Sequence, residues 1–154
     1  MQTGSGRSVY ISVREQQLTV KEGENAIRSF PISTSRFGLG SEEGSWKTPI
    51  GEFRIGQKIG HNHSQGTVFE GRKPIDKTGQ GSPDEDLVMS RILWLHGVEE
   101  HNANTRDRYI YIHGTNHEEE IGQPASRGCI RMTNADVIEL FDLVDEQTPV
   151  LIET

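Results

Sequence analysis

The sequence predicts a mainly β protein with one short helix, and three observations support this. Hydrophobic residues alternate with polar ones in several short segments, which is the period of strands with one buried face. Glycine is abundant, at 17 of 154 residues, while only 32% of residues are hydrophobic, and this combination favours many turns. Helical spacing is clear in one segment near the C-terminus.

The N-terminal part predicts a β-meander. Residues 1–7 are small and polar and are expected to form a flexible tail, so that one domain spans residues 8–154. Turns are expected at "REQQ" and "EGEN". The alternating positions are Val9, Ile11, Val13, Leu18 and Val20.

The middle of the chain predicts strands separated by a long polar segment. "PIGEFRIG" is typical of a short strand entered from a proline. Residues 56–90 are polar and broken by glycine and proline, and we expect a functional flap with one short strand near 67–69. Two similar strands follow, at Arg91–Gly97 and Arg108–Gly114, each ending in His-Gly.

The helix is predicted in "TNADVIELFDLV". Its hydrophobic residues Val137, Leu140, Phe141 and Val144 fall at i, i+3, i+4 and i+7. Thr133 or Asn134 can cap its N-terminus. "TPVLIE" then predicts a final strand.

Composition excludes several functional classes. The net charge of −7 provides no general basic excess for binding nucleic-acid phosphates. No apolar run approaches the ~20 residues of a membrane span. No signal peptide is visible in "MQTGSGRSVY", and a single cysteine cannot form an intramolecular disulfide. We expect a monomer.

The single cysteine, Cys129, stands in a Ser-Arg-Gly-Cys turn downstream of His113. A free thiol has a pKa of about 8.5, so few thiols are ionised at neutral pH. An imidazole beside it can remove the proton or hold the thiolate as an ion pair. His113 ends a predicted strand, and the loop after it can return Cys129 to its side.

The residues around Cys129 add further chemistry. Gly128 permits a backbone conformation in which its N–H and that of Cys129 point at one oxygen, as an oxyanion hole requires. Arg131, two positions on, could grip a substrate carboxylate, and Arg127 could favour the thiolate.

Simpler interpretations compete with each of these. Cys129 could be a small buried hydrophobe, and His113 a hydrogen-bonded strand residue. Arg131 could form a structural salt bridge with an acid such as Asp136. The rival histidine, His96, is better explained as a strand residue near the cleft rim.

Three other features of the sequence have structural interpretations. His61 and His63 have no third metal ligand at a telling spacing, so no metal site is expected. His117 and the three glutamates after it indicate a solvated loop. Core packing is the favoured interpretation of Trp46 and Trp94, with cleft lining as the alternative.

The motifs "HGT", "SRGCIRM" and "NADVIEL", with "TPIGEF" upstream, resemble the L,D-transpeptidase catalytic domain, the YkuD-like family. The resemblance covers roughly residues 8–153 and implies a β-sandwich-like domain with one short helix after the cysteine. The matching positions are His113, Gly114, Thr115, Gly122, Ser126, Gly128, Cys129, Ile130, Arg131 and Asp136.

The resemblance also implies roles. Cys129 would attack a peptide carbonyl at a meso-diaminopimelate centre, and His113, with its ring held by the Gly114 carbonyl, would act as the base. Gly128 and Cys129 would supply the oxyanion hole, whereas Ser126, Thr115, Arg127 and Arg131 would contact substrate. No cofactor is implied. Many family members have histidine where this chain has Arg127, which makes the site more positive.

The implied partners are peptidoglycan peptide stems and carbapenem-type inhibitors, and the implied location is the cell envelope or periplasm. Three functions stay open: a transpeptidase with an amine acceptor, a carboxypeptidase or crosslink hydrolase with water as acceptor, and a silent peptidoglycan-binding module.

Overall fold

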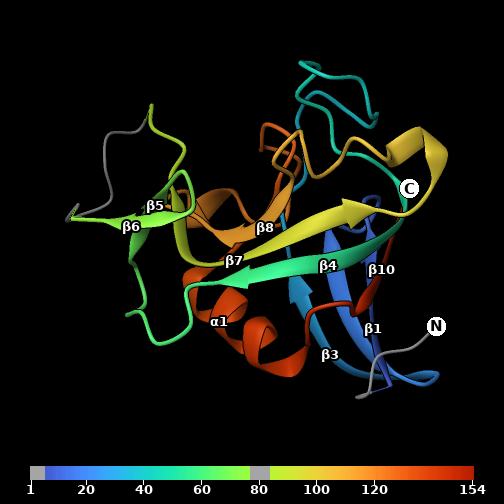
Figure 1. Ribbon diagram of the computed structural model, residues 1–154, viewed down its shortest axis with the longest axis horizontal. Helices are drawn as coiled ribbons and strands as arrows, with labels where there is room; N and C mark the ends of the chain where they lie inside the picture. The colour runs from blue at the N-terminus through green and yellow to red at the C-terminus, as the bar shows by residue number, and fades with distance from the viewer. Residues whose placement is uncertain (1–5, 77–83) are drawn as a thin grey trace.

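In the computed structural model, the described residues form ten strands that belong to one mixed sheet (Figure 1). The structure describes residues 6–76 and 84–154. Most of the expected tail, and residues 77–83 of the expected flap, lie outside the described residues. The prediction of a mainly β protein with one short helix is confirmed.

The predicted meander forms one end of this sheet. Its three strands pair in antiparallel fashion, and the C-terminal strand adds to the first in parallel register, with Val9 opposite Val150. Burial alternates as the sequence predicts, since Val9, Ile11, Leu18 and Val20 all face the core. The strands are β1 (Arg7–Ser12), β2 (Gln17–Glu22), β3 (Asn25–Pro31) and β10 (Pro149–Glu153).

The other half of the sheet carries the histidine and the cysteine. The strand expected at Arg108–Gly114 begins only at Tyr111. The backbone has a positive φ at Tyr109, a turn conformation that keeps this residue out of the strand. The expected flap holds a small hairpin. The strands are β4 (Gly51–Ile59), β5 (Val68–Glu70), β6 (Lys73–Ile75), β7 (Val88–Gly97), β8 (Tyr111–Gly114) and β9 (Ile130–Met132).

The one α-helix of the described residues, α1 (Asn134–Leu143), packs against β7 and β8 (Figure 1). Of the two proposed capping residues, Thr133 performs the role, because its hydroxyl accepts a hydrogen bond from the Asp136 N–H. Two short 3₁₀ helices, η1 (Glu100–Asn102) and η2 (Glu118–Glu120), lie in the loops before and after β8. No helix among the described residues is long and apolar enough to cross a membrane.

The main core lies between the two halves of the sheet and α1. It contains Ile11 and Phe30 from the meander, Leu95 from β7 and Leu140 from the helix. A smaller cluster packs on the other side of β7 and β8 and includes Trp94, Tyr111 and Cys129. The two faces of β8 therefore have different environments, and the second face positions the cysteine.

Candidate active site

The parallel pairing of β8 with β9 brings the histidine and the cysteine to one face of the sheet. In this ladder Ile112 lies opposite Ile130, and His113 lies opposite Arg131. Both isoleucines are in the main core, so the alternation of side chains turns His113 and Arg131 to the other face. Cys129, one residue before β9, lies beside Tyr111 on that same face.

The Cys129 thiol makes two hydrogen bonds to backbone. The Tyr111 N–H donates to Sγ at 3.3 Å, and the thiol donates to the Tyr109 carbonyl at 3.3 Å. Burial of the sulfur raises the pKa of Cys129 to about 11, although the Tyr111 N–H and nearby arginines act in the opposite direction. The resting group is thus a neutral thiol.

His113 is almost fully buried, with 2% of its surface exposed. Its Nδ1 lies 2.5 Å from the Gly114 carbonyl oxygen, so Nδ1 carries the proton that is donated. Burial lowers the pKa of His113, which keeps the imidazole neutral and leaves the Nε2 lone pair free to accept a proton. A side chain at Gly114 would collide with Asn134 and the Met89 carbonyl.

No hydrogen bond joins His113 to the sulfur within the described parts of the chain, 6–76 and 84–154. The thiol hydrogen points to the Tyr109 carbonyl instead. Transfer of the proton to His113 therefore requires rotation of the S–H bond. Catalytic hydrogen bonds are often long in free enzymes and shorten when substrate binds.

The turn before Cys129 is held by side-chain hydroxyls. Gly128 has φ of 122°, which favours glycine, and its carbonyl accepts a hydrogen bond of 2.9 Å from Thr48. The buried Ser126 hydroxyl donates to the Cys129 carbonyl at 2.6 Å and accepts from the Gly128 N–H at 3.3 Å. Because Ser126 already uses the Gly128 N–H, the oxyanion hole stays a prediction.

Arg131 is buried between two carboxylates. Its Nη2 lies 3.0 Å from Asp86, and its Nη1 lies 3.0 Å from Glu120. A structural salt bridge is therefore present, with these two acids and not with Asp136. A substrate carboxylate would have to displace one of them to reach these nitrogens.

The two other predicted substrate contacts have different surroundings. Arg127 is exposed, and its guanidinium lies 5.5 Å from the ring centre of Trp46. Thr115 is fully buried, and its hydroxyl accepts a hydrogen bond from the His117 N–H. Of this pair, Arg127 is the one with access to solvent.

A pocket of about 420 Å³ opens beside the sulfur. Trp46 lines it and is 51% exposed, so the expectation of core packing for this residue is wrong. Trp94 is buried in the smaller cluster, as expected. The lining residues are Glu43, Gly44, Trp46, Asp107, Arg108, Tyr109, Ile110, Arg127 and Cys129.

The rival histidine, His96, lies in β7 beyond Trp94. Its ring packs over Gly56 and contacts the edge of Trp94, and burial lowers its pKa. These contacts favour the interpretation of His96 as a strand residue.

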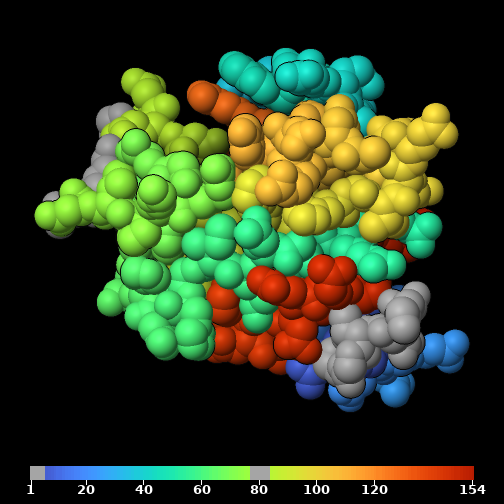
Figure 2. Space-filling view, viewed as in Figure 1, coloured from blue at the N-terminus to red at the C-terminus, as the bar shows by residue number. Residues whose placement is uncertain are grey.

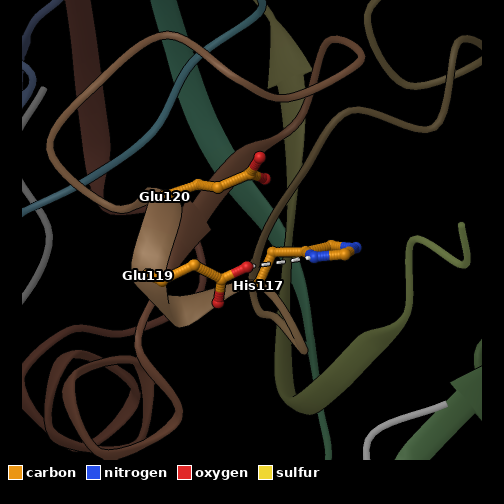
Figure 3. Close-up of side chains that lie close together, drawn as sticks. All are labelled: His117, Glu119 and Glu120. Carbon is orange, nitrogen blue, oxygen red and sulfur yellow. Dashed lines mark ion pairs between the residues drawn. The ribbon is translucent and has the colours of Figure 1, made fainter. Parts of the chain in front are cut away.

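Three of the remaining histidines, His61, His63 and His117, also have partners. His61 stacks on Phe141, and His63 meets the edge of Phe69, so the two contact different aromatic rings. The atoms that could bind a metal ion in His117, Glu119 and Glu120 lie within 4.8 Å of one another (Figure 3). Because Glu120 pairs with Arg131 and His117 Nε2 lies 2.7 Å from the Glu85 carbonyl, this loop is better bonded than the solvated loop expected.

Comparison with known proteins identifies the family. The model of the YkuD L,D-transpeptidase catalytic domain matches residues 6–152. This chain belongs to the YkuD family. The YkuD family acts on the cell wall.

Two relatives from Bacillus subtilis (strain 168), YqjB and YkuD, carry the term L,D-transpeptidase in their names. YqjB is 39% identical over 106 residues, covering 68% of this chain and 51% of YqjB. YkuD is 28% identical over 144 residues, covering 94% of this chain and 64% of YkuD. The chain thus spans between half and two thirds of the length of these relatives.

Solved structures share the YkuD fold. An L,D-transpeptidase from Mycobacterium smegmatis has a TM-score of 0.66 at 16% identity, over 99% of this chain and 60% of that one. L,D-transpeptidase 3 from Mycobacterium tuberculosis, in complex with a faropenem-derived adduct, has a TM-score of 0.65 at 17% identity, over 99% of this chain and 62% of that one.

Sequence reasoning missed the partners of the sulfur and of Arg131. Tyr109 and Tyr111 contact the sulfur through backbone atoms, which no side-chain motif signals. Asp86 comes from the polar segment 56–90, where no spacing links it to Arg131. For Glu120, the sequence offered one indication of a partner for Arg131, which is its place in a run of three glutamates.

We predict that alkylation of Cys129 by iodoacetamide accelerates up to about pH 11. A raised pKa keeps the proton on the thiol, so the reactive thiolate increases about tenfold per pH unit below the pKa. Intact mass measures the rate, since the chain has one cysteine, and Cys129→Ser serves as the blank. A rate that levels off near pH 7 would contradict the neutral thiol.

We also predict that Arg131→Ala lowers the free energy of unfolding by about 3 kcal/mol, because it leaves two carboxylates without their cation. Lys47→Ala, which removes a lysine from a solvent-exposed pair with Glu42, is the control and should cost less than about 1 kcal/mol. Urea unfolding measures both. An equal loss of unfolding free energy in both variants would mean that the ion pairs of Arg131 do not stabilise the fold more than an exposed pair does.

Proposed function

We propose that this chain is a cysteine-dependent L,D-transpeptidase that acts on peptidoglycan peptide stems at the cell envelope. The observation that carries the proposal is the shared face of Cys129 and His113 at the edge of an open pocket. Membership of the YkuD family supports the reaction class.

The first half-reaction forms a thioester. Sγ of Cys129 attacks the carbonyl carbon of the donor stem while Nε2 of His113 takes the thiol proton. In this proposal the N–H groups of Gly128 and Cys129 receive the negative oxygen that develops, and the Gly128 N–H must first leave its hydrogen bond to Ser126. The intermediate then expels the leaving amine, which takes the proton from His113, and the acyl group stays on sulfur.

The second half-reaction transfers the acyl group. An amine of a second stem attacks the thioester carbonyl, gives its proton to His113, and displaces the Cys129 thiolate, which recovers a proton. Water in place of the amine gives hydrolysis by the same steps. His113 acts in both halves as a general base and acid, because both reacting groups are neutral at rest.

Two solved relatives indicate a useful probe of this chemistry. One is in complex with a faropenem-derived adduct, and another, LdtMt1, is in complex with imipenem. A β-lactam carbonyl is open to the same thiol attack and leaves its mass on the protein. We therefore propose that carbapenems acylate Cys129.

Exposure to imipenem is predicted to add one drug mass to the wild-type chain and none to Cys129→Ala. His113→Ala should acylate at least about 100-fold more slowly, since a general base contributes that much or more. His96→Ala is the matched control and should acylate at the wild-type rate. Intact mass against time decides. An adduct on Cys129→Ala, or slowing only in His96→Ala, would overturn these assignments.

Incubation with a tetrapeptide stem, with and without an amine acceptor, is predicted to give a crosslinked product only when the amine is present. The masses of the products distinguish transfer from hydrolysis. Shortened peptide in both samples, with no crosslinked mass, would replace the transpeptidase by a carboxypeptidase. No product and no imipenem adduct would leave a binding module.

A further inference from the structure

Three exposed aromatic residues gather around the pocket beside Cys129. Trp46 and Tyr109 line the pocket and are 51% and 54% exposed, and Phe37, 42% exposed, meets Trp46 edge to face with ring centres 5.5 Å apart. Five large hydrophobic side chains are exposed in the described ranges 6–76 and 84–154, and these are three of them. Clustered exposed hydrophobic groups mark binding surfaces.

Both pocket aromatics have an unfavourable backbone conformation. Trp46 has φ of 61° and Tyr109 has φ of 57°, values that bulky residues rarely adopt. The structure fixes each by its carbonyl, since the Ser35 hydroxyl donates to that of Trp46 and the Cys129 thiol donates to that of Tyr109. Strain of this kind is found at functional sites, and here it accompanies two exposed rings that line the pocket.

The Arg108 side chain holds this arrangement across the pocket. Arg108 donates to the Lys47 carbonyl at 2.8 Å and to the Gly40 carbonyl at 3.3 Å, which ties the loop that carries Trp46 to the segment that carries Tyr109. Figure 2 shows these segments, cyan and yellow-orange, side by side at the top of the molecule. The two rings therefore belong to one supported surface.

The charges around the pocket favour a neutral ligand. The lining of the pocket includes two acids, Glu43 and Asp107, and two arginines, Arg108 and Arg127, so the formal charges of the lining balance. The aromatic rings can stack on an apolar surface of a ligand, and the charged side chains can form hydrogen bonds with its hydroxyl groups. A sugar ring has both, with C–H groups on its face and hydroxyls around its rim.

We propose that Trp46 and Tyr109 bind pyranose rings of the glycan strand that carries the donor stem. This inference rests on the proposed function, because it names the substrate class of the same site. A ring stacked on Trp46 would hold a glycan-linked stem near Cys129 and favour it over a free peptide. Arg127, which lies over the indole, is placed to bond the sugar hydroxyls.

The first experiment compares a disaccharide-linked tetrapeptide with the same tetrapeptide lacking the sugar. The wild-type kcat/KM should be about 3- to 10-fold higher for the sugar-linked stem, which is the range of one aromatic stacking contact. Trp46→Ala should bring the ratio to about 1, and Trp46→Phe should restore part of it. Ile27→Ala removes an exposed side chain from β3 and should keep the wild-type ratio.

A wild-type ratio of 1, or equal losses for both substrates in Trp46→Ala, would overturn the proposal. Thermal melting of each variant shows that it is folded. A chain inactive on both substrates and unreactive with imipenem would refute the proposed function. In that case the binding experiment still decides the glycan site.

The second experiment measures binding without reaction. Chitotetraose, a neutral sugar oligomer, is titrated into Cys129→Ala while tryptophan emission is recorded. The exposed Trp46 should respond with a saturable change, which is lost in Cys129→Ala/Trp46→Ala and kept in Cys129→Ala/Ile27→Ala. No saturable change, a change that persists without Trp46, or an equal response to the free tetrapeptide would each overturn the proposal.

Discussion

The candidate active site depends on one short parallel pairing, between β8 and β9. Three register pairs hold it, from Ile112 opposite Ile130 to Gly114 opposite Met132. Its isoleucines enter the main core, so burial of hydrophobic surface fixes which way every other residue faces. A shift of one residue would turn His113 into the core and separate it from Cys129. The same register therefore stabilises the core and places His113 on the face of Cys129.

The second consequence of this pairing is electrical neutrality. Burial disfavours both the thiolate and the imidazolium, so the two groups rest uncharged. A preformed ion pair would be more reactive toward any electrophile. A neutral pair becomes nucleophilic as the proton moves during attack, which limits reaction to carbonyls that are bound and oriented. The hydrogen bond from the Cys129 thiol to the Tyr109 carbonyl further limits the reactivity of the thiol.

Sequence periodicity predicted the strands and α1 because their burial is local and regular. The placement of Cys129 and His113 on one face was predicted because a glycine turn before the cysteine and a histidine at a strand end, in that order, indicate thiol chemistry, and the family resemblance supports it. Their catalytic role stays a prediction. Longer-range features were not predictable. Arg131 pairs with Asp86 across 45 positions, through a segment with no regular pattern. Trp46 was expected in the core, since hydrophobicity alone does not reveal that a positive φ presents its ring to solvent.

The proposed reaction requires that His113 is a neutral base, with its proton on Nδ1 and its Nε2 lone pair available to the thiol. Nitrogen NMR of the His113 ring, recorded against pH, tests it most directly. We expect the neutral Nδ1–H form at pH 7 and protonation only below the ordinary pKa of 6.5. An imidazolium at pH 7, or a neutral ring protonated on Nε2, would contradict it.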